Sequence, residues 1–153
     1  MPSIIIIGSG PAGISAALYA VRAGVDTTVL TKGPGALDRA EKIENYYGFA
    51  EPVSGAELER RSIENARRLG VQFVQTEAVG LTWTDRLTVE TLAGAYPADA
   101  VILATGASRA VPRIPGLTGL EVHGVSWCAA CDAFFYRGKA VSYTHLTLPT
   151  KLE

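Results

Sequence analysis

Sulfur is scarce in this sequence, which has two cysteines and one methionine among 153 residues. Two cysteines close one disulfide at most, so a fold stapled by several disulfides is excluded. A structural zinc site needs four ligands. The cysteines and histidines of the whole chain number four, with spacings that match no common zinc site: His123, Cys128, Cys131 and His145. The sequence therefore favours an apolar core, and we expect no metal site.

Long apolar runs and an excess of one charge are also missing. No stretch approaches the roughly 18 apolar residues of a membrane-spanning helix, and the N-terminus has no basic region before its short apolar run. The net charge of −1 and the pI of about 6.1 give no support for nucleic acid or an anionic membrane as a partner. We expect a soluble, cytoplasmic protein, and in such proteins a close cysteine pair is more often catalytic or metal-binding than structural.

The first thirty residues have the pattern of a βαβ unit. Ser3–Ile7 contains four consecutive isoleucines, which predicts a buried parallel strand. Residues 14–24 have apolar positions at helical spacing and end at a glycine that suits a helix C-terminus. Val25–Leu30 then predicts a second strand.

A glycine loop, G-x-G-x-x-G, joins the first strand to the helix. Gly8 allows a tight turn, Gly10 lets a pyrophosphate approach the backbone, and Gly13 lets the helix pack on the strand. The helix N-terminus presents unpaired N–H groups and a positive dipole end to the phosphates. The sequence therefore predicts a dinucleotide site. Its expected contacts are Gly8, Ser9, Gly10, Pro11, Ala12 and Gly13.

The end of the second strand departs from the usual dinucleotide pattern. An acid that binds the ribose is expected there, but the chain reads Leu30-Thr31-Lys32, and Asp26 lies too early in the strand. Lys32 could contact a phosphate, or it could be a solvated loop lysine. An NADP-binding module therefore remains an alternative interpretation of the glycine loop.

Residues 31–55 predict a long functional loop with one helical turn around Leu37–Lys42. Ser54 and Glu57 fit a capping box that opens a helix ending at Gly70. A strand follows at 71–75. The pattern then changes to an antiparallel meander with strands at 78–84, 86–92 and near Ala95–Tyr96, followed by a buried strand that ends at Gly106.

The meander and the following segment "VILATGASRAVPRIPG" resemble the FAD-binding half of flavoproteins that have two dinucleotide-binding domains. The resemblance implies an α/β fold: a Rossmann-like parallel sheet with a three-stranded antiparallel meander. Ile43–Phe49 resembles the loop that passes the flavin ring, with Asn45 as its polar contact. The resemblance also places cofactor contacts at Ala78, Ala104, Thr105 and Gly106.

The two cysteines lie in the segment "WCAACD". A disulfide between Cys128 and Cys131 closes a very short loop and constrains little of the unfolded chain. Neighbouring C-x-x-C thiols lower one another's pKa, and the thiolate is the reactive form. Asp132 could exchange a proton with a thiolate. A redox pair is favoured, while a structural disulfide and a zinc site remain alternatives.

The segment "GVSWCAACDAFFYRGKAV" resembles the redox segment of low-molecular-weight thioredoxin reductases, a group of FAD-dependent pyridine nucleotide-disulfide oxidoreductases. The resemblance implies that Cys131 faces the flavin, Cys128 exchanges with the protein substrate, and Asp132 is the acid/base. Electrons would pass from NADPH through FAD to the disulfide and on to a thioredoxin-like protein. The parent enzyme would be a homodimer.

Two departures from the family pattern keep alternatives open. The family's Gly-Gly-Gln-Leu segment is replaced by residues 33–38, and Trp127 before the first cysteine is unusual. Both fit a ferredoxin-dependent flavin disulfide reductase or another disulfide substrate. A free-standing FAD- or NAD(P)-binding module with a regulatory thiol pair is a further alternative.

The family resemblance predicts two domains, and a separate resemblance predicts a non-native tail. Residues 1–113 are expected to form the N-terminal part of an FAD-binding domain, and residues 114–140 the start of a truncated second dinucleotide-binding domain. Val141–Thr150 resembles one reading frame of a sequencing adaptor, so residues 141–153 are expected to be non-native; a natural short variant is the alternative. The NADPH site is then missing. We expect the fragment alone to lack NADPH-dependent activity and to hold FAD weakly.

Overall fold

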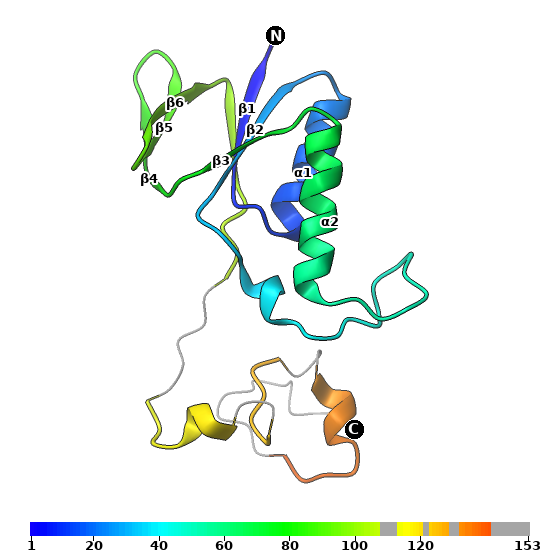
Figure 1. Cartoon of the computed structure of the whole chain (residues 1–153). Helices are drawn as coiled ribbons and strands as arrows, with labels where there is room; N and C mark the ends of the chain where they lie inside the picture. The colour runs from blue at the N-terminus through cyan, green and yellow to red at the C-terminus, as the bar shows by residue number, and fades with distance from the viewer. Residues whose placement is uncertain (108–112, 121–122, 129–131, 142–153) are drawn as a thin grey trace, which may run out of the picture. The chain divides into compact units, whose positions relative to one another are not determined.

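The computed structural model describes residues 1–107, 113–120, 123–128 and 132–141. The chain forms two compact units, unit 1 (Met1–Ser108) and unit 2 (Arg109–Glu153), each considered by itself (Figure 1). Cys131 and residues 142–153 of the predicted tail lie outside the described residues.

Unit 1 contains two sheets, two α-helices and one 3₁₀ turn. The strands are β1 (Ser3–Ile7), β2 (Asp26–Thr31), β3 (Gln72–Gln75), β4 (Ala78–Trp83), β5 (Leu87–Thr91), β6 (Gly94–Ala98) and β7 (Ala100–Leu103). The helices are α1 (Pro11–Arg22), η1 (Ala36–Arg39) and α2 (Gly55–Arg68).

The larger sheet is parallel, with strand order β3-β2-β1-β7, and the smaller sheet is an antiparallel meander, β4-β5-β6. The predicted α/β fold class is therefore confirmed. Ile7 is in register with Leu30 on one side and Leu103 on the other, so three strands end at one edge of the sheet. The glycine loop leaves β1 at this edge, where open α/β sheets bind their ligands.

Alternating residues of the central strands form two apolar clusters on opposite faces of the parallel sheet. Ile6 and Val29 pack with buried residues of α1 and α2, whereas Ile5 and Leu30 pack with Val89 of the meander. Figure 1 shows both helices on one face and the meander on the other. Burying a side chain of this size stabilises the fold by roughly 1.5–3 kcal/mol. The unbroken isoleucine run is thus explained by a strand that is covered on both sides.

Several elements differ in extent from their predictions. The strand expected to be buried and to end at Gly106 is β7, which ends at Leu103 and whose residues are exposed or half-buried. The third meander strand spans all of β6, whereas the sequence suggested only a short piece near its middle. Pro97 argues against a strand in the sequence pattern, because proline has no N–H to donate. It is tolerated here because β6 lies at the edge of its sheet. The single helical turn lies at η1, earlier than predicted, because Ala40 is already extended.

The N-terminus of α2 makes half of the predicted capping box. Ser54 Oγ accepts a hydrogen bond of 3.2 Å from the Glu57 N–H, which confirms the N-cap. The Glu57 carboxylate instead accepts hydrogen bonds from the guanidinium groups of Arg60 and Arg61. These hydrogen bonds lower the pKa of Glu57 from 4.5 to about 2, and the bond with Arg60 has the larger effect.

Unit 2 has only short elements among its described residues, η2 (Leu117–Leu120) and η3 (Ala133–Tyr136). Where burial is described between residues 113 and 141, every residue is exposed or half-buried. Local turns supply its backbone hydrogen bonds, such as those from the N–H groups of His123 and Val125 to the Leu120 carbonyl. In the part of the chain that the structure describes, no helix is long and apolar enough to cross a membrane.

Candidate functional site

The three loop glycines have different surroundings, and the differences reveal what each position requires. A Cβ on Gly8 would lie 2.2 Å from the Ala104 carbonyl oxygen, and one on Gly13 would lie 1.9 Å from the Gly8 carbonyl oxygen. Both glycines are therefore needed to let strand, loop and helix backbones touch. A Cβ on Gly10 would meet nothing within 4 Å. The space beside Gly10 is open, as a site for an approaching pyrophosphate requires.

The N-terminus of α1 is uncapped by side chains. Gly10 is the N-cap, Pro11 is the first helical residue, and no acidic residue lies in the first turn. The positive end of the helix dipole is therefore left for an anion from outside the chain. This arrangement adds charge complementarity to the open space at Gly10.

Buried hydroxyl groups support the loop from behind. Ser9 is 5% exposed, and its Oγ lies 2.7 Å from Thr31 Oγ1, which also accepts a hydrogen bond from the Gly33 N–H. The Gly8 N–H donates to the Leu30 carbonyl at 2.8 Å. These bonds fasten the glycine loop to the end of β2. Thr31, which replaces the usual ribose-binding acid, thus has a structural role that sequence reasoning missed.

Thr76, directly after β3, is a second residue that sequence reasoning missed. It is 9% exposed, and its Oγ1 has no hydrogen-bond partner in the structure. An unsatisfied buried hydroxyl is uncommon and calls for an explanation. Its backbone N–H bonds the Thr31 carbonyl, so it lies at the same edge of the sheet as the glycine loop. A bound ligand at this edge would be a natural partner.

The remaining predicted contacts of unit 1 lie around this edge in different settings. Lys32 is largely exposed and forms an ion pair of 3.2 Å with Glu77. Ala78 begins β4 and packs against the meander-side cluster. The Ala104 N–H donates to the Ile7 carbonyl at 2.9 Å, which places the Ala104–Gly106 segment beside the glycine loop.

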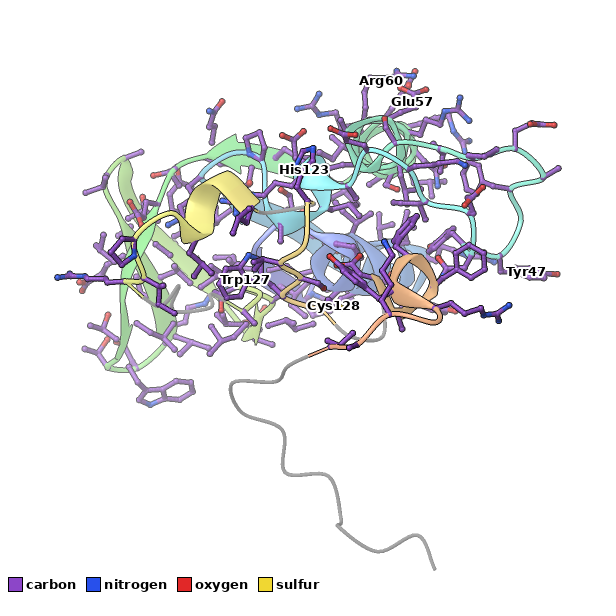
Figure 2. The ribbon with its side chains drawn as sticks, turned by 90° about the horizontal axis from the view of Figure 1, so that it is seen from below. Tyr47, Glu57, Arg60, His123, Trp127 and Cys128 are labelled. Atoms are coloured by element: carbon purple, nitrogen blue, oxygen red, sulfur yellow. The ribbon has the colours of Figure 1, made fainter. Side chains whose placement is uncertain are left out.

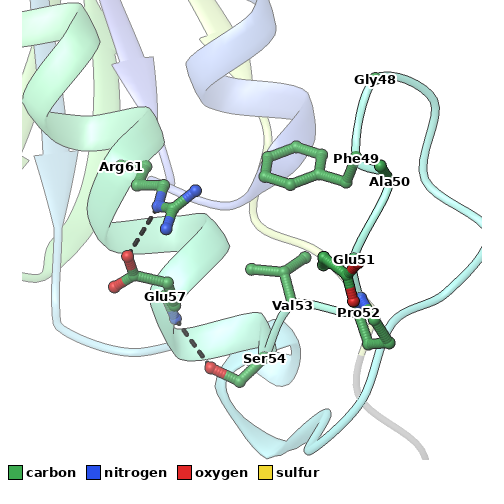
Figure 3. Close-up of a pocket in the computed structure, with 9 residues that line it drawn as sticks. All are labelled: Gly48, Phe49, Ala50, Glu51, Pro52, Val53, Ser54, Glu57 and Arg61. Carbon is green, nitrogen blue, oxygen red and sulfur yellow. Dashed lines mark hydrogen bonds and ion pairs between the residues drawn. The ribbon is translucent and has the colours of Figure 1, made fainter.

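The predicted flavin-ring loop is closed by an isolated bridge between Ile43 and Val53. Asn45 lies in this loop and is exposed. Tyr47 is 99% exposed and points away from the ribbon (Figure 2). Residues 48–54 line an open pocket with two residues of α2, and the Arg61 guanidinium carbon lies 5.9 Å from the ring centre of Phe49 (Figure 3).

These features of unit 1 fit a dinucleotide such as FAD. The glycine loop offers open space, the uncapped helix end offers complementary charge, and Thr76 offers an unsatisfied hydroxyl. The structure brings the glycine loop and Ala104 together. Asn45 belongs to a separate loop, between the bridged residues Ile43 and Val53, and is exposed there.

The redox segment of unit 2 is organised around Ser126, which sequence reasoning missed. Its hydroxyl donates to Asp132 Oδ2 at 2.5 Å and accepts from the Cys128 N–H at 3.1 Å. The Asp132 N–H donates to the Cys128 carbonyl at 3.0 Å. Cys128 is disulfide-bonded and lies beside Trp127 on one loop (Figure 2). A serine two residues before the cysteine is a known turn-forming signal that could have revealed this role.

Comparisons with known proteins agree with a dinucleotide site in unit 1 and a redox segment in unit 2. Residues 2–146 match the family described as pyridine nucleotide-disulphide oxidoreductase. The chain is 36% identical to a thioredoxin reductase of Streptomyces coelicolor over 92% of its own length and 45% of the relative's. It is 41% identical to a bifunctional thioredoxin reductase/thioredoxin of Mycobacterium leprae, covering 91% of this chain and 31% of that protein.

Solved structures give the same result. An atypical thioredoxin reductase from Desulfovibrio vulgaris is 42% identical with a TM-score of 0.66, over 90% of this chain and 47% of that one. The thioredoxin reductase of Streptococcus pyogenes is 36% identical with a TM-score of 0.77, over 87% and 44%. The chain thus spans less than half the length of these relatives. The expected resemblance is confirmed, and the chain belongs to the pyridine nucleotide-disulphide oxidoreductase family.

Proposed function

We propose that this chain carries the FAD-binding and redox-active segments of a disulfide oxidoreductase of the thioredoxin reductase type. The open space beside Gly10 carries the proposal, because the neighbouring glycines are both packed against backbone while this one is not. The thioredoxin reductases among the relatives support it. Residues 1–113 are proposed as the N-terminal part of the FAD-binding domain, and residues 114–140 as the start of the NAD(P)H domain.

In this proposal the glycine loop holds the pyrophosphate of FAD. The N–H groups of Ala12 and Gly13, at the end of α1 that no side chain caps, would hold the phosphates. Thr76 Oγ1 would gain a hydrogen-bond partner in the ligand. Further contacts are proposed for Ser9, Pro11, Lys32, Asn45, Ala78, Ala104, Thr105 and Gly106.

Bound FAD would accept two electrons, either as a hydride from NADPH or one at a time from another donor such as ferredoxin, and would pass both to the disulfide of Cys128 and Cys131. Cys131 is proposed to face the flavin and Cys128 to exchange with the substrate. In that exchange the Cys128 thiolate attacks a substrate disulfide, and one substrate sulfur leaves as a thiolate. The Cys131 thiolate then attacks the mixed disulfide and releases the second sulfur. The cysteine pair loses two electrons and the substrate gains them.

Asp132 is proposed to exchange protons with these sulfur atoms as general acid and base. A small disulfide protein of the thioredoxin type is the proposed substrate, since one relative is a bifunctional thioredoxin reductase/thioredoxin. A homodimer is proposed for the complete enzyme.

The roles of the two cysteines are testable on the chain itself. Cys131→Ser leaves Cys128 as the single thiol, and Cys128→Ser leaves Cys131. Each reduced variant is mixed with a thioredoxin whose nucleophilic cysteine carries a thionitrobenzoate group and whose second active-site cysteine is replaced by serine, and release of thionitrobenzoate is followed by absorbance. We expect Cys131→Ser to react about tenfold faster, because the proposal makes Cys128 the thiol that exchanges with the substrate. Faster reaction of Cys128→Ser would reverse the proposed roles.

A further inference from the structure

Ser126 links the two groups that disulfide exchange uses in unit 2. Its Oγ lies 2.5 Å from Asp132 Oδ2, 3.1 Å from the Cys128 nitrogen and 3.3 Å from the Cys128 carbonyl oxygen. The Cys128 N–H can only donate, so it holds the serine oxygen in place whatever the hydroxyl hydrogen does. The hydroxyl hydrogen therefore has two acceptors within reach, the aspartate and the Cys128 carbonyl.

A hydroxyl with two acceptors can serve a carboxyl group in both of its protonation states. When Asp132 is ionised, the Ser126 hydroxyl donates to it, and the distance of 2.5 Å is that of a charge-assisted bond. When Asp132 carries a proton, its O–H can donate to Ser126 Oγ while the hydroxyl turns to the Cys128 carbonyl. The carboxyl group then keeps its position through a complete proton-transfer cycle.

We propose that Ser126 is a positioning residue that holds the Asp132 carboxyl group in both protonation states during disulfide exchange. The inference rests on the proposed acid/base role of Asp132. It adds a residue that contributes through Asp132 and not through a contact of its own with the reacting sulfur.

The reaction that this arrangement would assist is reduction of the Cys128 disulfide by a dithiol. One thiolate of the dithiol attacks a cysteine sulfur, a mixed disulfide forms, and the leaving cysteine sulfur takes a proton from Asp132. The second thiolate of the dithiol displaces the other cysteine sulfur, which is protonated in turn. The dithiol loses two electrons and two protons, and the cysteine pair gains them, with Asp132 reprotonated in between.

The test uses the full 153-residue chain and dithiothreitol, so it needs no cofactor. The second-order rate constant of disulfide reduction is measured by quenching with a maleimide and counting modified cysteines by mass. We expect Asp132→Asn to slow reduction about 100-fold, at the lower end of general acid/base effects. Ser126→Ala should slow it about tenfold, because the carboxyl group remains but is held less well. The double variant should match Asp132→Asn, because Ser126 acts only through the aspartate.

Two variants of equal shape separate positioning from packing. Ser126→Thr keeps the hydroxyl, and Ser126→Val replaces it with a methyl group. We expect the threonine variant to react like the parent chain and the valine variant to react like Ser126→Ala. This pair keeps the test valid if the alanine variant fails to fold, which far-ultraviolet circular dichroism reports.

Each contrary result overturns a defined part of the account. An unchanged rate in Asp132→Asn removes the acid/base role and the inference with it. A slow Asp132→Asn with a normal Ser126→Ala overturns only the role of Ser126. A double variant whose losses multiply, or a threonine variant as slow as the valine one, means that Ser126 merely supports the turn.

Discussion

Unit 1 and unit 2 are each stabilised by a different kind of interaction. Unit 1 has a parallel sheet covered on both faces, and the cluster on each face contains residues with no solvent exposure. The described part of unit 2 has no buried residue; its organisation comes from turns and from the hydrogen bonds of Ser126. Apolar burial thus positions the glycine loop, whereas local polar contacts position the redox segment. We therefore expect substitutions of buried apolar residues to destabilise unit 1, and substitutions of hydrogen-bonding residues to affect unit 2.

The largest effect is expected from the core of unit 1. Ile6→Ala should lower the free energy of unfolding by about 4 kcal/mol, because Ile6 is fully buried between sheet and helices. The measurement is urea denaturation followed by far-ultraviolet circular dichroism. Phe134→Ala is the control from unit 2, since Phe134 is 73% exposed, and it should change the midpoint very little. Equal losses in both variants would contradict the contrast between the units.

Gly13→Ala should follow, with a loss of about 3 kcal/mol, since its Cβ would overlap the Gly8 carbonyl oxygen. Gly10→Ala is the matched control from the same loop. It should change stability by less than about 0.5 kcal/mol, because lower entropy of the unfolded chain offsets the loss of a favoured N-cap residue. Similar losses in the two variants would show that Gly10 is also needed for packing.

A smaller effect is expected at the helix N-cap. Ser54→Ala should destabilise unit 1 by about 1 kcal/mol, because the Glu57 N–H loses its acceptor. Ser54→Asp should retain most of the stability, because aspartate also caps helices well. A stability loss in Ser54→Asp as large as that in Ser54→Ala would contradict the capping role.

The smallest effects are expected from two glutamates of α2, and they have opposite signs. The pKa of Glu57 is lowered to about 2 by Arg60 and Arg61, so its contribution is present above pH 4.5 and is lost as the pH falls toward 2. The pKa of Glu59 is raised, mainly by burial and secondly by the negative charge of Asp38. Ionised Glu59 therefore opposes folding, and the stability of the chain falls as the pH rises above 4.5.

Urea midpoints between pH 2 and 7 test both signs. Glu57→Gln should flatten the acid side of the stability curve, and Glu59→Gln should raise stability at neutral pH. A Glu59→Gln variant that is less stable than the parent at pH 7 would mean that the buried carboxylate has a stabilising partner.

Much of unit 1 could be predicted from the sequence, because each strand and helix carries its own pattern. The isoleucine run, the glycine spacing and the Ser54 cap depend on residues close together in the chain. The roles of Thr31 and Thr76 could not be predicted, since they depend on which strands become neighbours in the sheet. The ion pair of Lys32 with Glu77, 45 residues apart, has the same origin.

Unit 2 illustrates another limit of sequence reasoning. The cysteine spacing predicts redox chemistry. The serine two residues earlier marks a turn, but this pattern does not by itself indicate that the serine hydroxyl also bonds Asp132. The capping box of α2, of which only the Ser54 half forms, shows the same limit of sequence reasoning. Glu57 has the right spacing, yet Arg60 and Arg61 are stronger partners for a carboxylate than a backbone N–H.

Gly10 leaves space for a dinucleotide pyrophosphate, and binding there can be followed by an amide NMR titration of the chain with FAD. Even weak binding is visible in this experiment. We expect saturable shifts of the amide signals of residues 8–13, and at least about tenfold weaker binding, or 1.4 kcal/mol, in the equally stable Gly10→Ala variant. Absence of saturable shifts at the loop, or equal binding by Gly10→Ala, would contradict this expectation.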